Sequence, residues 1–141
     1  PDLVFDQSPG ELFVVRVAGN VVSPDLLASL EYGVQFLGVP LIVVVGHSGC
    51  GAVDAAIKVL KTDAQLPGHL PDLIKAIKPA VVVAQKTQQG TLLDNAIAEN
   101  VRRQVARLER SPPVVQKAYG DRRIDIVGGV YGIATGKITL V

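Results

Sequence analysis

The sequence predicts an α/β fold built on a mostly parallel sheet. Residues 41–45 are five consecutive apolar residues closed by Gly46, a pattern that predicts a buried strand. Apolar residues at helical spacing precede this strand over residues 24–37 and follow it over residues 51–61. A helix, a strand and a helix in this order favour parallel neighbouring strands. With 141 residues, 48% of them hydrophobic, the chain is expected to form one domain, residues 1–141, with a sizeable core.

The first part of the chain predicts a strand and then a helix. Residues 12–18 are rich in β-branched and aromatic side chains, which predicts a strand with Arg16 either at its end or held by a partner. Ser23 is suited to cap a helix that carries Pro24 in its first turn. The apolar positions of this helix are Leu26, Leu27, Leu30, Val34 and Leu37, and Gly38 ends it.

The remaining elements follow from periodicity and turn residues. Residues 62–72 are loop-like, and residues 72–88 then follow a helical pattern in which Pro79 either kinks the helix or starts another. Residues 91–110 give the longest helical pattern, opened by Thr91 and Asp94 in a capping-box arrangement. The other predicted elements are a short helix over 113–119, a buried strand over 124–131 and an edge strand over 137–141.

Two side chains that bind metals well follow the strand at 41–45. His47 and Cys50 lie three residues apart between this strand and the next helix, where α/β proteins build their sites. The chain contains one Cys and two His, and this turn uses the Cys and one of the His. An imidazole and a thiolate are good zinc ligands, and the start of a helix favours the thiolate. Zinc is therefore the leading hypothesis, and a structural Cys beside a turn His is the alternative.

Composition argues against several other classes of function. A net charge of +1 gives no strong case for a nucleic-acid or membrane partner. The basic stretch at 101–110 is flanked by Glu99 and Glu109, which favours a solvated helix face over a phosphate-binding patch. The longest apolar run, residues 39–45, is too short to span a bilayer. A single Cys excludes an intrachain disulfide and suits a reducing, cytoplasmic location.

Four segments of the sequence match one known family. Residues 31–51 carry the strongest match, and residues 5–22, 99–108 and 135–141 match closely as well. The matching residues of the first segment are Glu31, Tyr32, Val34, Leu37, the strand, Gly46, His47, Cys50 and Gly51, whereas Gly33 stands where the family usually has Ala. Over nearly all 141 residues the chain thus resembles the β-class carbonic anhydrases.

The resemblance implies a fold, a cofactor and a reaction. The expected fold is a three-layer arrangement of helices around a mostly parallel sheet with a C-terminal edge strand. The expected cofactor is zinc, bound by His47 and Cys50, with the backbone of Gly51 close to the site. In the family, zinc-bound water loses a proton and attacks CO2, which gives bicarbonate reversibly. Members are dimers or higher assemblies, so a homodimer or larger homo-oligomer is expected here.

The sequence also departs from the family pattern. The family's Cys-x-Asp-Ser-Arg run, which supplies a third zinc ligand and an Asp–Arg pair that controls access to the metal, is absent from these 141 residues. The strand that carries this run and the N-terminal helices are absent as well, so either the protein is short or the sequence omits its beginning. No catalytic residue is therefore predicted, and CO2 hydration by this chain is expected to be weak or absent.

Two ways of completing the zinc site remain open at this point. In the first, one zinc per chain is completed by water, Asp2, Asp6 or His69. In the second, two chains share one zinc through two His and two Cys, and the protein is a non-catalytic structural or regulatory zinc protein. The missing central strand favours assembly, because its flanking strands must pair directly or another chain must fill the gap.

Overall fold

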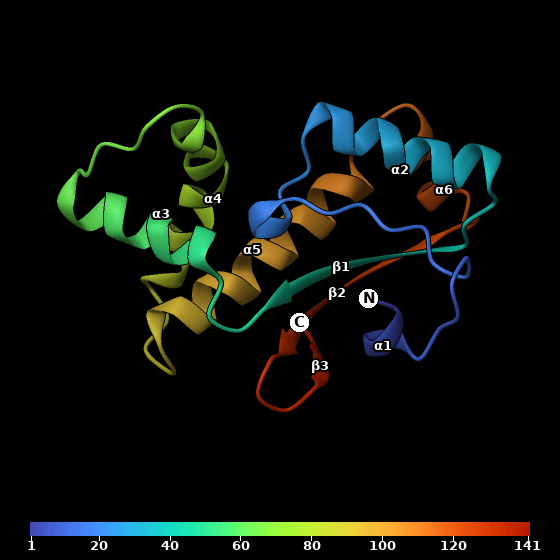
Figure 1. Cartoon of the computed structure of the whole chain (residues 1–141). Helices are drawn as coiled ribbons and strands as arrows, with labels where there is room; N and C mark the ends of the chain where they lie inside the picture. The colour runs from blue at the N-terminus through green and yellow to red at the C-terminus, as the bar shows by residue number, and fades with distance from the viewer.

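A computed structural model describes residues 1–141, with six α-helices, one short 3-10 helix and three strands (Figure 1). In chain order the elements are α1 (Asp2–Phe5), η1 (Ala18–Asn20), α2 (Pro24–Phe36), β1 (Leu41–His47), α3 (Gly51–Thr62), α4 (Leu70–Ala84), α5 (Leu92–Glu109), α6 (Val114–Gly120), β2 (Asp125–Gly132) and β3 (Lys137–Leu140). None of these helices combines the length and apolarity that crossing a bilayer requires.

The three strands form one sheet in the order β1-β2-β3. β1 and β2 are parallel, with Leu41 opposite Asp125 and His47 opposite Tyr131. β3 pairs with β2 in the antiparallel direction, with Gly129 opposite Leu140. The predicted α/β class is confirmed, and so are the parallel strands and the C-terminal edge strand.

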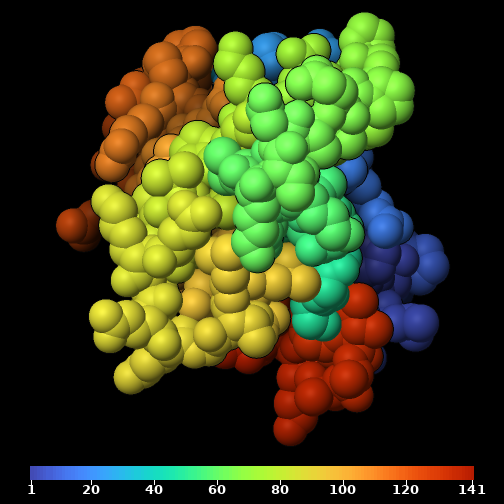
Figure 2. Space-filling view, turned by 90° about the vertical axis from the view of Figure 1, so that its left-hand side faces the viewer, coloured from blue at the N-terminus to red at the C-terminus, as the bar shows by residue number.

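One face of the sheet carries most of the core. The side chains of Ile42 and Val44 on β1 and Ile126 on β2 are buried against α5, α2 and α6, together with Val22, Val34, Val101, Leu108, Val115, Ala118 and Ile124. On the other face of β1, Val43 and Val45 are only half-buried. A second cluster, built around Ile77 and Val81 of α4, joins α3 and α4 to the first half of α5. In Figure 2, α3 and α4 cover the side that faces the viewer, and the end of the chain with β3 protrudes at the lower edge.

Residues 12–18 do not form the predicted strand. The segment precedes η1 without any regular structure, and no backbone N–H or C=O of residues 12–16 has a hydrogen-bond partner. Phe13, Val14 and Val17 are 44%, 45% and 43% exposed. β-branched and aromatic residues suit a pleated, half-buried surface, but a strand also needs a neighbour to bond with. Without a paired neighbour, the β-rich composition alone does not produce a strand here.

β1 has one unpaired edge. The bonds from Asp125 N–H to Pro40 O and from Ser48 N–H to Tyr131 O mark the even-numbered residues as those that face β2. In a regular parallel ladder, the odd-numbered residues from Leu41 to His47 then turn their N–H and C=O groups to the other side, where no strand lies. No strand of this chain, and no part of residues 12–18, pairs with that edge of β1.

The helices agree with the sequence prediction apart from their ends. Ser23 Oγ accepts a hydrogen bond from Leu26 N–H at 3.3 Å and caps α2 as expected. Thr91 Oγ1 accepts from Asp94 N–H at 3.1 Å and caps α5. The predicted helix over 72–88 is α4, which begins earlier and contains Pro79 without breaking. The short helix α1 was not predicted.

Candidate metal centre

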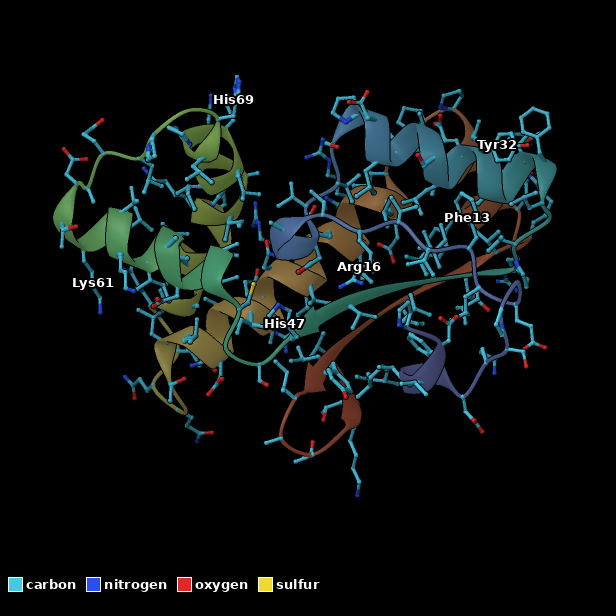
Figure 3. The ribbon with its side chains drawn as sticks, viewed as in Figure 1. Phe13, Arg16, Tyr32, His47, Lys61 and His69 are labelled. Carbon is cyan, nitrogen blue, oxygen red and sulfur yellow. The ribbon has the colours of Figure 1, made fainter.

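His47 and Cys50 bracket a tight turn at the carboxyl end of β1. Gly49 lies at the centre of this turn with φ +66°, a left-handed conformation that favours glycine. Cys50 is the N-cap residue of α3, so the turn leads directly from the strand into the helix. Figure 3 shows His47 at the tip of β1, below the first turns of α3 and beside α5. The predicted strand, turn and helix around these two residues are all present.

The ring of His47 is oriented by the backbone carbonyl of the next residue, Ser48. His47 Nδ1 lies 3.0 Å from the carbonyl oxygen of Ser48. A carbonyl oxygen only accepts, so this contact places the proton on Nδ1 and leaves the lone pair on Nε2. The side chain is exposed, which leaves Nε2 accessible to a metal ion. This arrangement, in which one ring nitrogen is held by a carbonyl, is the usual one for a metal-binding histidine.

Cys50 is a free thiol in a largely buried position. Its residue is 4% exposed and belongs to the cluster that contains Val53 and Ile77. It is the N-cap residue of α3 and so lies at the amino-terminal end of this helix. The protein therefore supplies one soft sulfur and one imidazole nitrogen in neighbouring positions of the chain, and both donor types suit zinc.

Ser48 fixes the turn to the end of the neighbouring strand β2. Its N–H donates to Tyr131 O at 2.9 Å, and its Oγ accepts from Ile133 N–H at 3.0 Å. These two bonds tie the His47–Cys50 turn to the connection between β2 and β3. We did not single out Ser48 from the sequence, although its place between two candidate ligands was a signal that could have identified it.

Buried amides hold the neighbouring turn at Gly19 and Asn20. Asn100 of α5 is fully buried, and its Nδ2 donates to Gly19 O at 2.7 Å. Gln104, one turn later, accepts from Val22 N–H at 3.0 Å through Oε1 and donates to Asn100 Oδ1 at 3.4 Å. These two residues were also missed in the sequence. The signal was present, because both lie on the apolar stripe of α5, where a polar residue needs a partner.

The two donors are of the right kind for zinc but are too few to complete a site by themselves. No group of three or more His, Cys, Asp or Glu side chains is close enough together to hold a metal ion. Asn20 Nδ2 is buried without a partner, but an amide donor fits a hydrogen-bond acceptor and not a cation. Zinc sites in proteins use three or four protein ligands. Further ligands would therefore have to come from outside the pair.

The other predicted site residues lie elsewhere or have other partners. Asp2 is in the first turn of α1, and Asp6 follows α1 in a left-handed conformation. His69 precedes α4 and lies well away from His47 in Figure 3. Asp54, four residues after Cys50, is not a predicted ligand and forms an exposed ion pair with Lys58 at 2.6 Å. A Cβ at Gly51 would meet no atom within 4 Å, so packing within this chain does not require glycine there.

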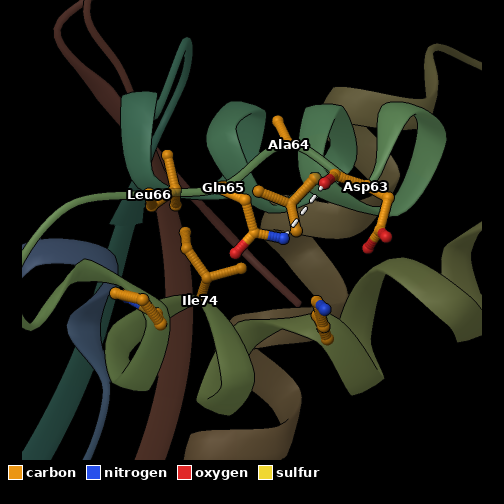
Figure 4. Close-up of a pocket in the computed structure, with 8 residues that line it drawn as sticks. Asp63, Ala64, Gln65, Leu66 and Ile74 are labelled. Carbon is orange, nitrogen blue, oxygen red and sulfur yellow. Dashed lines mark hydrogen bonds between the residues drawn. The ribbon is translucent and has the colours of Figure 1, made fainter.

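A small hollow lies at the far end of α3, away from the metal-binding turn. It has a volume of about 140 Å³ and lies between the residues that follow α3 and the first half of α4 (Figure 4). Gln65 Nε2 spans it to donate to Asp63 O at 3.5 Å, and Ile74 and Leu66 contribute apolar walls. Its lining contains no His or Cys, so it is not an alternative metal site.

Comparison with known proteins identifies the family. A family model described as carbonic anhydrase matches residues 1–138. A solved β-carbonic anhydrase from Coccomyxa, in complex with acetazolamide, superimposes on all of the chain with a TM-score of 0.83 and 30% sequence identity, and the chain covers 65% of that structure. The chain belongs to the β-class carbonic anhydrases.

Curated relatives agree with this assignment. The carbonic anhydrase of Mycolicibacterium smegmatis is 34% identical over 139 residues, and carbonic anhydrase 2 of Mycobacterium tuberculosis is 35% identical over 140. Each match covers 99% of this chain and 67% of the relative, so the chain spans about two thirds of their length. A tetrameric β-carbonic anhydrase of Sordaria macrospora matches with a TM-score of 0.86 and 25% identity over 99% of this chain and 73% of that one.

Proposed function

We propose that this β-class carbonic anhydrase binds zinc through His47 Nε2 and Cys50 Sγ. The observation that carries the proposal is the orientation of His47, whose Nδ1 is held by Ser48 O so that Nε2 is free. The thiol of Cys50 follows three residues later at the start of α3. Zinc, when bound, makes a water molecule acidic enough to lose its proton near neutral pH. The turn between the two residues holds them in place through the bonds that Ser48 makes.

Metal analysis of the purified chain tests the zinc proposal. We expect zinc in the wild-type protein and its loss from Cys50→Ser and His47→Ala, because each variant removes one of only two available donors. The matched control is His69→Ala, which removes the other histidine of the chain and should keep the zinc. Circular dichroism shows whether each variant is folded. A folded Cys50→Ser protein with unchanged zinc content would contradict the assignment.

The same measurement separates the two ways of completing the site. A shared site in a twofold dimer would contain two His47 and two Cys50 around one zinc, which is a closed tetrahedral set. Among residues 1–141 no third donor lies beside the pair, and a second copy of the chain would supply two more donors near the edge of β1 that ends at His47. It requires one zinc per two chains and a dimer that dissociates with a chelator. The shared site would be excluded by one zinc per chain in a protein whose oligomeric state does not change when a chelator removes the metal.

We expect the 141-residue chain to hydrate CO2 at least about a hundredfold more slowly than carbonic anhydrase 2 of Mycobacterium tuberculosis assayed beside it. The reason is that the chain brings together only two donors and none of the Asp–Arg pair that the family uses. Stopped-flow hydration with a pH indicator measures the rate. A rate close to that of the relative would mean that another group of this chain completes the site.

A further inference from the structure

The last turns of α5 line an open groove that none of the metal chemistry uses. The groove has a volume of about 500 Å³, which lies within the range of small-molecule sites. Its lining comes from α5 and from the residues just after it, with Leu27 of α2 and Ala76 of α4 on its sides. In Figure 1, α5 runs from left to right while the arrowhead of β1 points left, so this end of α5 lies opposite the end of the sheet that carries His47.

Three arginines face this groove, and no acidic residue does. Arg103, Arg107 and Arg110 are all exposed members of the lining, which contains no Asp or Glu. None of the three takes part in an ion pair, since the ion pairs of the protein are Asp54–Lys58, Glu99–Arg102 and Lys117–Asp121. The groove therefore has an uncompensated positive charge.

The two acidic residues that flank the basic stretch are engaged elsewhere. Glu99 lies 3.7 Å from Arg102, which is outside the groove. Glu109 is in no ion pair, and its interaction with the Tyr119 hydroxyl of α6 raises the pKa of that hydroxyl. The arginines of residues 101–110 are exposed, as expected of a solvated helix face, but neither carboxylate forms an ion pair with the three arginines that line the groove.

The end of a helix explains only part of this charge. Arg107 and Arg110 lie in or just after the last turn of α5, where a cation stabilises the helix dipole. Arg103 lies six residues before the helix end at Glu109, which is about 9 Å along the axis at about 1.5 Å per residue and beyond the reach of that effect. Arg103 and Arg107 are also one turn apart, a spacing at which like charges repel. An anion in the groove would offset this repulsion.

We propose that this groove binds a small molecule with a diphosphate group, of the size of a nucleoside diphosphate. Guanidinium groups bind phosphoryl oxygens in pairs, and three of them match two adjacent phosphoryl groups better than one. The apolar remainder of the lining, which includes Leu27 and Ala76, provides a surface for the organic part of the ligand. The site is separate from His47 and Cys50 and does not depend on zinc.

Calorimetric titration of the zinc-loaded and zinc-free chain with ADP, pyrophosphate, phosphate and adenosine tests the proposal at one fixed ionic strength. We expect saturable binding of one ADP or pyrophosphate per chain, and phosphate at least about tenfold weaker. Arg103→Gln and Arg107→Gln should each weaken binding about tenfold, the effect of one charged hydrogen bond. Arg102→Gln is the matched control, because it removes the same charge from the same helix outside the groove, and it should leave affinity unchanged.

A comparison of ADP with pyrophosphate also shows which part of the ligand the groove recognises. Tighter binding of ADP than of pyrophosphate would assign a role to the apolar walls, and equal binding would assign recognition to the diphosphate alone. Either result supports the site. The proposal is overturned if neither ligand saturates below about 1 mM, if phosphate binds as tightly as pyrophosphate, or if Arg102→Gln weakens binding as much as the groove variants. Thermal unfolding of each variant confirms that the compared proteins are folded.

Discussion

Replacing Asn100 with alanine is expected to lower the free energy of unfolding by about 2–4 kcal/mol. The Asn100 amide is fully buried and donates to Gly19 O at 2.7 Å, so its removal leaves that carbonyl without this donor. Gln104 Nε2 also loses the Asn100 oxygen to which it donates. A buried polar group without a partner destabilises the folded state by the full cost of removing that group from water. The deleted side-chain atoms also leave a cavity, which destabilises the folded state further. Urea denaturation followed by circular dichroism measures the change.

The control for this variant is Arg102→Ala on the exposed side of the same helix. Arg102 forms only an exposed ion pair with Glu99, and removing such a pair changes stability by about 0–1 kcal/mol. The alanine has a similar helix propensity, so the two variants differ mainly in burial. If Asn100→Ala lost less than about 1 kcal/mol, the turn at Gly19 would have to be held by something other than this amide.

The sequence predicted the parts of the fold in which a local pattern and its tertiary surroundings agree. The run at residues 41–45 formed a strand because its apolar side chains pack against α5. The helix after Thr91 formed because the cap and the apolar stripe point to the same element. Residues 12–18 have an equally strong local pattern but no bonded neighbour, and a strand depends on pairing that the pattern of one segment does not describe.

The candidate site also has residues that the sequence predicted and residues that it did not. His47 and Cys50 were predicted because their types and spacing are visible in the sequence. The roles of Ser48 and Asn100 depend on partners 85 and 81 residues away, Ile133 and Gly19, and those distances in sequence carry no local signal. The arginines of the groove were visible, but which of them pair with Glu99 or Glu109 depends on side-chain placement, and only Arg102, which lies outside the groove, forms such a pair. Charge counted along the chain did not predict charge in the groove.

Two strand glycines leave room for one valine of α5. A Cβ at Gly128 would lie 2.6 Å from Val101 Cγ1 and 3.0 Å from Val105 Cγ2, and a Cβ at Gly46 would lie 2.7 Å from Val101 Cγ2. Contacts this short require the helix or the sheet to move. Val101 is fully buried, so it cannot turn away into solvent. The close packing of α5 on β1 and β2, directly beneath the metal-binding turn, therefore depends on the missing side chains.

Gly128→Ala is expected to lower the free energy of unfolding by about 1–3 kcal/mol, because the added methyl group overpacks this contact. The reason can be tested directly with Val101→Ala, which removes Val101 Cγ1, the atom that the new methyl group at Gly128 would meet at the shortest distance. The double variant should be more stable than the sum of the two single changes predicts, by at least about 1 kcal/mol. Gly120→Ala is the matched control, since a Cβ there meets no atom within 4 Å and should cost nothing. Urea denaturation of the four proteins gives the coupling, and an additive double variant would show that the strain at Gly128 lies somewhere other than Val101.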